Sequence, residues 1–173
     1  MQPQFVHLRM HSEFSVTDST VRLDSAIGKV KEHNVGALGL TDFNNIFGGL
    51  IFYTHAMKAG VKPIVGCDLV IENTSDRDKP YRMAVLCENH DGYKNLCEIL
   101  TKAWLKNQYM GRGETKLEWL LEQNEGLIML SGGPEGILAQ LCLAGKGKEA
   151  LAMAQKMKAA WPDRFFIELQ RAG

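Results

Sequence analysis

The sequence predicts an α/β protein with a largely parallel β-sheet, and three observations carry this prediction. Short apolar segments typical of buried strands recur along the chain, separated mostly by segments with helical periodicity. Several of these strands end in polar residues, which favours a β/α barrel over an open doubly wound sheet, although the pattern alone leaves both open. The 173 residues, 45% of them hydrophobic, suit one domain with one buried core.

Six strands and six helices are expected along the chain. The apolar runs that predict strands cover residues 6–12, 35–41, 62–72, 83–87, 126–130 and 164–169. Helical spacing and candidate caps predict helices over residues 23–34, 49–59, 91–104, 115–120, 134–143 and 149–160. The alternation of the two kinds of segment indicates parallel strands joined by crossover helices.

The predicted helix over residues 49–59 places Leu50, Tyr53 and Met57 on one apolar stripe. Gly60 follows at the position of a left-handed helix cap. These two signals together define the helix and its end.

Local signals set three further boundaries. Gly66 interrupts the third strand at Gly66-Cys67-Asp68, where the glycine marks a bend that reorients the aspartate. Asp91 caps the helix that runs to Trp104. Thr115 and Glu118 form a capping box at the start of a short helix.

Composition excludes several classes of function. Twenty basic and twenty acidic side chains cancel, so no overall charge draws the chain to nucleic acid, and any DNA contact must be local. The cysteines lie far apart in apolar runs without CxxC spacing, as expected of reduced, buried thiols in the cytoplasm, and they are Cys67, Cys87, Cys97 and Cys142. Residues 1–4 carry no signal-peptide pattern, and no apolar run is long enough to span a membrane.

The end of the first predicted strand is the strongest candidate for a metal or phosphate site. Because side chains alternate along a strand, His7, Arg9 and His11 share one face, opposite Val6, Leu8 and Met10. Parallel neighbouring strands would bring Asp18, Asp42 and Asp68 to the same rim. Imidazoles and carboxylates are the ligands that zinc and harder cations require.

Three of these polar features have a simpler alternative. His7 is either a hydrogen-bonded strand-end histidine, the favoured reading, or a metal ligand. Asp42 either caps the following segment or belongs to the site. Ser131-Gly132-Gly133 is either a tight turn, the favoured reading, or a phosphate cradle, and it lacks the lysine of a P-loop.

Basic residues interleave with aromatic ones in the segment between residues 102 and 116. The basic residues are Lys102, Lys106, Arg112 and Lys116, and the aromatic ones are Trp104 and Tyr109. Such a set contacts DNA backbone and bases in some proteins, but a solvated loop is the favoured reading.

Five ordered segments together resemble a known family. The segments FVHLRMHSEFSVTDS, ALGLTDFNNIFGGLIFY, GVKPIVGCDL, NEGLIMLSGG and PDRFFIEL are similar to the amino-terminal polymerase-and-histidinol-phosphatase (PHP) domain of bacterial DNA polymerase III alpha subunits. The resemblance implies a distorted seven-stranded (β/α) barrel of the TIM-like type, with a potential trinuclear metal site at the strand ends. It also implies that residues 1–173 are the N-terminal part of such a domain, truncated after about six strands, without the palm, thumb and fingers.

The resemblance implies that several ligands of this metal site are replaced. Arg9 stands at the first position of the family's His-x-His motif, Phe43 at the histidine of Thr-Asp-His, and Arg82 where a histidine precedes the fourth strand. Gly133 stands where metal-binding members often carry a ligand. A guanidinium has no lone pair, so Arg9 cannot ligate a cation.

The surviving candidates for metal ligation are His11, Asp18 and Asp68, the last replacing a glutamate by a shorter carboxylate. We expect Arg9 to fill the vacated metal volume and to bind Asp18 or Asp68. The site residues under consideration are therefore Arg9, His11, Asp18, Asp42, Phe43, Asp68 and Arg82. Hydrolysis by a metal cluster needs cations that activate water, so a degenerate, inactive site is expected.

The resemblance implies a module of the replicative polymerase that acts mainly as a structural and protein-interaction domain. Its partners would be the rest of the alpha subunit, the proofreading exonuclease subunit and, through the full-length nucleotidyltransferase, DNA. No cofactor is expected in this segment beyond residual zinc, manganese or magnesium, with magnesium serving the full-length polymerase. The alternative is a metal-dependent phosphoesterase or 3′–5′ exonuclease that uses His11, Asp18 and Asp68. An incomplete barrel would leave an unpaired strand edge, which predicts self-association or rearrangement.

Overall fold

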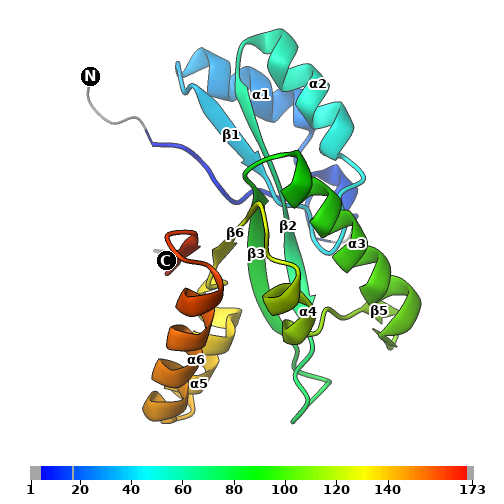
Figure 1. The fold of residues 1–173 in the computed structure, drawn as a ribbon. Coiled ribbons are helices and arrows are strands. Elements are labelled where there is room, and N and C mark those ends of the chain that lie inside the picture. The colour runs from blue at the N-terminus through cyan, green and yellow to red at the C-terminus, as the bar shows by residue number, and fades with distance from the viewer. Residues whose placement is uncertain (1–4, 17, 171–173) are drawn as a thin grey trace. The chain divides into compact units, whose positions relative to one another are not determined.

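The computed structural model describes residues 5–16 and 18–170 and divides the chain into two compact units, Met1–Cys67 and Asp68–Gly173 (Figure 1). Both units combine helices with strands, which confirms the mixed α/β class. None of the helices in the described part of the chain is both long and apolar enough to cross a membrane.

The first unit contains two helices and a parallel pair of strands. Its elements are η1 (Glu13–Ser15), α1 (Leu23–Glu32), β1 (Ala37–Leu40), α2 (Gly49–Ala59) and the first part of β2 (Lys62–Ile71). β1 pairs in parallel with β2, Ala37 opposite Lys62 and Leu40 opposite Val65. The core of this unit consists of Leu23, Ile27, Val30, Leu38, Leu40, Phe52, Ala56 and Val61.

Helix α2 forms over the predicted residues but buries a different face. Gly60 has φ 77° and caps its C-terminus in the left-handed conformation, as predicted. The predicted stripe is exposed, with Leu50 at 75% and Met57 at 55%, whereas Phe52 and Ala56 are fully buried. Because α2 carries apolar residues around much of its circumference, the pattern could not determine which face packs against α1 and β1.

The segment over residues 6–12 is not the regular strand predicted for it. Gly39 N donates to His7 O at 2.7 Å, and Thr41 N donates to Met10 O at 2.8 Å. The two donors are two residues apart in and just after β1, whereas their acceptors are three residues apart, so the pairing is irregular. The side chains of the segment consequently do not keep the strict alternation that was used to place them.

The apolar side of this segment is also less buried than predicted. Leu8 is 41% exposed and Val6 is half-buried, whereas Met10 packs against the core of the first unit. Only the last part of the segment thus contributes to the core.

The second unit holds the longer elements. They are the rest of β2, β3 (Tyr81–Cys87), α3 (His90–Lys106), β4 (Gln108–Tyr109), β5 (Arg112–Gly113), α4 (Leu117–Glu122), β6 (Leu127–Leu130), η2 (Gly133–Glu135), α5 (Ile137–Leu143), α6 (Gly147–Ala160) and β7 (Phe165–Phe166). Its main sheet has the order β2-β3-β6-β7 and is not closed in the described part of the chain.

The strand directions in the second unit are mixed. β3 and β6 are antiparallel, with Ala84 opposite Leu130, whereas β6 and β7 are parallel. The antiparallel pair departs from the alternating parallel scheme that was predicted. Central strand residues are fully buried, for example Met83 and Met129, and Trp161 after α6 is fully buried as well.

Three predicted boundaries are wrong in detail. Strand β2 runs through Gly66-Cys67-Asp68 without interruption. Asn89, not Asp91, caps α3, since its side chain accepts a hydrogen bond from Gly92 N. Thr115 does not cap α4, because its backbone pairs with the end of β2: Thr115 N donates to Val70 O at 2.8 Å.

The four cysteines are free thiols, but they are not uniformly buried. Cys67 is buried and Cys142 is exposed, which corrects the expectation for the latter. Burial raises the pKa of the Cys87 thiol to about 12, so this thiol stays protonated at neutral pH.

Candidate functional site

In the first unit, Asp42 lies two residues after the end of β1, with only 1% of its surface exposed. Its Oδ1 atom accepts hydrogen bonds from Ser12 N at 2.6 Å and from the Ser15 hydroxyl at 2.7 Å. The Ser12 hydroxyl donates to the same carboxylate at 2.9 Å, and Ser15 Oγ in turn accepts from Phe43 N. We call Asp42, Ser12 and Ser15 the Asp42 cluster, and it ties the loop after residue 12 to the end of β1.

The two serines of this cluster were not among the predicted site residues. The loop was recognisable as rich in hydroxyl groups, but nothing in a single sequence indicates that Ser12 and Ser15 meet a carboxylate about 30 positions away. The donors to Asp42 come from the preceding loop, so its carboxylate binds that loop and does not cap the segment that follows it.

Of the three candidate ligands, His11 and Asp18 lie together in the first unit. His11 Nδ1 pairs with Asp18 Oδ2, and both side chains are partly shielded from solvent. The hydroxyl of Ser19 donates a hydrogen bond to His11 O at 2.8 Å and so holds the backbone at His11. The Phe43 ring lies near the imidazole, with 6.4 Å between ring centroids, and supplies no metal-binding atom.

The third candidate ligand, Asp68, lies in the second unit and has an arginine partner there. Its side chain is fully buried, and its Oδ2 accepts a hydrogen bond from Arg82 Nη2 at 2.7 Å. Arg82 also faces the exposed Glu135, with 3.3 Å between Nη1 and Oε2. The guanidinium thus neutralises the carboxylate directly.

The donor set of the described residues does not fit the multinuclear metal site that the family resemblance implies. No three side chains of His, Cys, Asp or Glu in that part of the chain are grouped so that they could hold a metal ion. Asp42 and Asp68 already accept hydrogen bonds from serines and from an arginine. We therefore assign no metal-dependent chemical step to these residues.

The Ser131-Gly132-Gly133 segment has the geometry of a tight turn. Gly132 has φ 85°, and a Cβ atom at this position would overlap the carbonyl oxygen of Arg82. The close approach of two backbones explains the glycine without a phosphate. Gly133 contributes no side chain to any site.

His7 lies on the surface, and its ring packs edge-on against Phe5 with 4.7 Å between centroids. Its carbonyl accepts the hydrogen bond from Gly39 N described above. Neither contact involves a side chain that could ligate a metal ion together with His7.

Much of the basic and aromatic set between residues 102 and 116 makes contacts within the protein. Lys102 Nζ donates to Gln123 Oε1 at 2.8 Å, and Tyr109 OH donates to Asp78 Oδ1 at 2.9 Å. Arg112 Nε donates to Glu114 at 3.0 Å. These partners favour a structural role over a DNA-binding surface.

Glu114 is the centre of a second carboxylate cluster that the sequence did not reveal. It is fully buried, and its Oε2 accepts from both Nε and Nη2 of Arg77, at 2.9 and 2.8 Å. Its Oε1 accepts from Arg112. We call Glu114, Arg77 and Arg112 the Glu114 cluster; its members come from a loop and a hairpin far apart in sequence, so no local pattern signals it.

Comparison with known proteins shows to which family the chain belongs. The model of the PHP domain family matches residues 7–172, so the chain belongs to the PHP family. Two solved structures share the fold: a putative metal-dependent phosphoesterase from Bifidobacterium adolescentis (TM-score 0.53, 8% identity, 95% of this chain and 85% of that one) and an amidohydrolase from Chromobacterium violaceum (TM-score 0.54, 12% identity, 96% and 86%).

Within this family, the chain is similar to DNA polymerase III alpha subunits. It is 40% identical to that of Pseudomonas fluorescens over 172 residues, and 36% identical to that of Escherichia coli strain K12 over 172 residues. Each alignment covers 99% of this chain but only 15% of the relative. The chain is therefore a PHP segment that corresponds to a small part of these polymerase subunits.

Proposed function

We propose that this chain is the PHP module of a bacterial replicative DNA polymerase III alpha subunit and acts mainly as a structural and protein-interaction domain. The similarity to alpha subunits over nearly the whole chain supports this assignment. The polymerase activity itself, which uses magnesium, would lie in the remainder of the subunit. We place the protein in the cytoplasm, where the bacterial chromosome is replicated.

The observation that carries the structural role is the ion pair between Asp68 and Arg82. In metal-binding members of the family, the resemblance places a histidine where this chain has Arg82. Here the buried Asp68 carboxylate accepts a hydrogen bond from the guanidinium at 2.7 Å, which balances its charge without a metal ion. Arg9 and Phe43 likewise stand where the family resemblance places histidines, and neither side chain can coordinate a metal ion. These residues support a degenerate site.

A restoration experiment tests the degenerate site. Arg9→His, Phe43→His and Arg82→His are combined, and zinc and manganese binding are measured by calorimetry and elemental analysis on folded protein. We expect no stoichiometric metal in the unaltered chain and a gain in the triple variant. A matched control combines Arg9→Gln, Phe43→Leu and Arg82→Gln, which removes the cations without adding imidazoles. A fully occupied two- or three-metal cluster in the unaltered chain would contradict the proposal.

The His11–Asp18 pair supports a second candidate function, a metal-dependent phosphoesterase or 3′–5′ exonuclease. This function predicts metal-stimulated release of phosphate or nucleotides that His11→Ala abolishes. Release no greater than in a buffer blank, by protein whose folding is verified by circular dichroism, would eliminate it.

The partners follow from the main proposal. They are the rest of the alpha subunit, the proofreading exonuclease subunit and DNA bound by the full-length protein. The isolated segment would cover its open sheet edge by self-association, which sedimentation at increasing concentration would reveal.

A further inference from the structure

Helix α6 concentrates positive charge in a chain that is neutral overall. Residues 136–162, which span α5 and α6, contain four lysines and a single acidic residue, Glu149. All four lysines are exposed, and they are Lys146, Lys148, Lys156 and Lys158. Because the whole chain carries no net charge, contact with a polyanion has to come from a local surface of this kind.

Three of these lysines are available to an external anion. The ammonium group of Lys146 lies 3.5 Å from the carboxylate of Glu149, so these two charges offset each other. Lys148, Lys156 and Lys158 have no such carboxylate in the part of the chain that the structure describes. An exposed ammonium group without an internal partner binds a phosphate without first breaking an ion pair.

The stability of the helix does not explain the position of Lys148. This residue lies in the first turn of α6, where the helix dipole is positive and a cation is unfavourable. Lys158 lies in the last turn, where a cation is favourable. A cation at the unfavourable end without a carboxylate partner indicates a role outside the helix.

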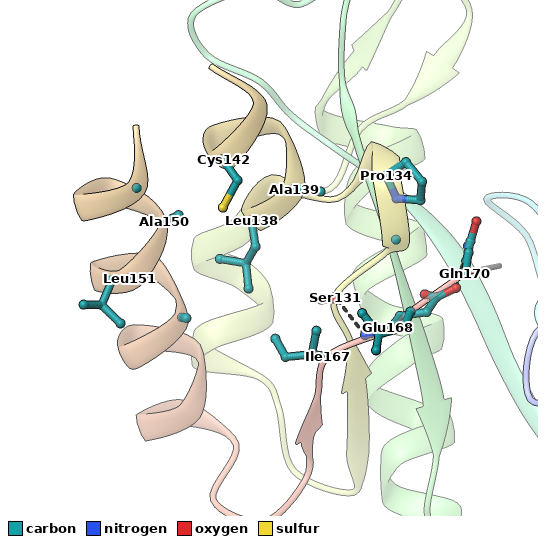
Figure 2. A pocket seen from close by; sticks show the side chains of 14 residues that line it. Ser131, Pro134, Leu138, Ala139, Cys142, Ala150, Leu151, Ile167, Glu168 and Gln170 are labelled. Carbon is teal, nitrogen blue, oxygen red and sulfur yellow. Dashed lines mark hydrogen bonds between the residues drawn. The ribbon is translucent and has the colours of Figure 1, made fainter. Parts of the chain in front are cut away.

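The three unpaired lysines lie apart from the apolar side of α6. That side and α5 line an apolar groove of about 590 Å³, to which α6 contributes Ala150 and Leu151 among other residues (Figure 2). Lys148, Lys156 and Lys158 are not lining residues of this groove. A ligand of the lysines therefore does not need to enter the groove, and substitutions at these lysines leave its lining unchanged.

The spacing of the lysines fits the two sugar-phosphate backbones that flank a groove of DNA. Lys156 and Lys158 follow Lys148 by eight and ten residues, which is about 12–15 Å along the axis at the rise of an α-helix. The major groove of B-DNA is about 12 Å wide. Residues 150–155, which lie between the two ends, contain no acidic side chain that would repel a phosphate.

We propose that α6 binds the backbone of duplex DNA, with Lys148 on the phosphates of one strand and Lys156 and Lys158 on those of the other. The choice of DNA among polyanions rests on the proposed function, because a module of a replicative polymerase works beside the duplex that the polymerase holds. The contact is independent of base sequence, since the ammonium groups meet phosphates and not base edges. It gives an interaction module of neutral overall charge a local DNA contact.

The salt dependence of DNA affinity measures this contact. Each phosphate that a lysine neutralises contributes about −0.9 to the slope of log affinity against log salt concentration. We expect the 173-residue chain to bind a fluorescein-labelled duplex of about 20 base pairs, followed by anisotropy between about 10 and 50 mM salt, with a slope of about −2.7. Lys148→Gln, Lys156→Gln and Lys158→Gln together should remove most of this slope and lower the affinity at least about tenfold at the lowest salt.

Two matched variants separate the α6 surface from net charge. The first removes the same number of exposed, unpaired lysines from the first unit and should leave the slope unchanged: Lys31→Gln with Lys58→Gln and Lys62→Gln. The second keeps the charges on α6 and should also keep the slope: Lys148→Arg with Lys156→Arg and Lys158→Arg. Circular dichroism verifies the folding of each variant.

Three results would overturn the proposal. One is a slope that the three α6 glutamines leave unchanged, or no binding of the duplex even at the lowest salt. Another is an equal loss of affinity in the first-unit variant, which would mean that net charge alone acts. The third is binding to vesicles that contain phosphatidylglycerol, abolished by the α6 glutamines while the DNA slope persists, which would identify a lipid surface as the ligand.

Binding of the purified proofreading exonuclease subunit by the same preparation tests the proposed function separately. A chain that binds this subunit but shows no lysine-dependent slope would refute the α6 assignment alone. A chain that binds DNA through α6 but not the exonuclease subunit would support the α6 assignment and contradict the protein-interaction role.

Discussion

The two units of the chain each bury a carboxylate at a strand end or hairpin, and they satisfy it with different donors. Asp42, 1% exposed, accepts from a backbone N–H and from the hydroxyls of Ser12 and Ser15. Glu114, fully buried, accepts from the guanidiniums of Arg77 and Arg112. The first cluster contains one formal charge, whereas the second contains a carboxylate and two cations.

This difference determines how each cluster tolerates change. A serine hydroxyl is both a donor and an acceptor and rotates to suit its neighbour, whereas a guanidinium only donates. The hydrogen bond to Glu114 raises the pKa of Arg77 above its ordinary value, which favours the charged guanidinium. The Asp42 cluster can therefore rearrange its hydrogen bonds, and the Glu114 cluster cannot.

Among the changes from a carboxylate to an amide, the largest effect is expected for Glu114→Gln. In the glutamine, an amide NH2 replaces one carboxylate oxygen and faces an arginine donor, from which it cannot accept a hydrogen bond. The two arginines would also lose their counter-charge. Because both arginines retain some solvent contact, we expect a loss of about 2–3 kcal/mol in the free energy of unfolding, measured by urea denaturation. Glu118→Gln, the same change on an exposed residue, is the control and should lie within about 0.5 kcal/mol of the parent.

A smaller effect is expected for Asp42→Asn, although Asp42 is equally buried. The amide oxygen still accepts from Ser12 N, and the new NH2 donates to a serine hydroxyl that turns to accept it. We expect a loss of about 1 kcal/mol in the same measurement. Asp42→Leu, which offers no acceptor, should cost about 3 kcal/mol; equal losses for the Asn and Leu variants would refute the rearrangement.

The smallest effect, and one of opposite sign, is expected next to Glu114 at Thr115. Its hydroxyl is buried and has no hydrogen-bond partner among the described residues. Thr115→Val keeps the branched shape and removes the unsatisfied group, so we expect a gain of up to about 1 kcal/mol in stability. Thr115→Ser retains the hydroxyl and should show no gain, and a loss in the valine variant would mean that the hydroxyl is bonded in solution.

Elements with strong local patterns were predictable from the sequence. Helical spacing over residues 23–34 predicted α1, which buries Leu23, Ile27 and Val30, and Gly60 predicted the end of α2. Predictions that needed the identity of a packing partner were wrong: the stripe of Leu50 and Met57 is exposed, and the segment over residues 6–12 carries an irregularity that no alternating pattern encodes. Local sequence sets backbone propensity, but not the surface against which a face packs.

The properties of the candidate site also divide into those that the sequence determines and those that depend on packing. The sequence by itself determined which side chains are unable to ligate a metal, because Arg9, Phe43 and Arg82 lack usable lone pairs whatever the fold. Only the tertiary structure decided that Asp42 binds serines, that Asp68 binds Arg82 and that Arg77 meets Glu114. The coordinating chemistry of a side chain is intrinsic to that residue, whereas a hydrogen-bond partner tens of residues away is selected by how the whole chain folds.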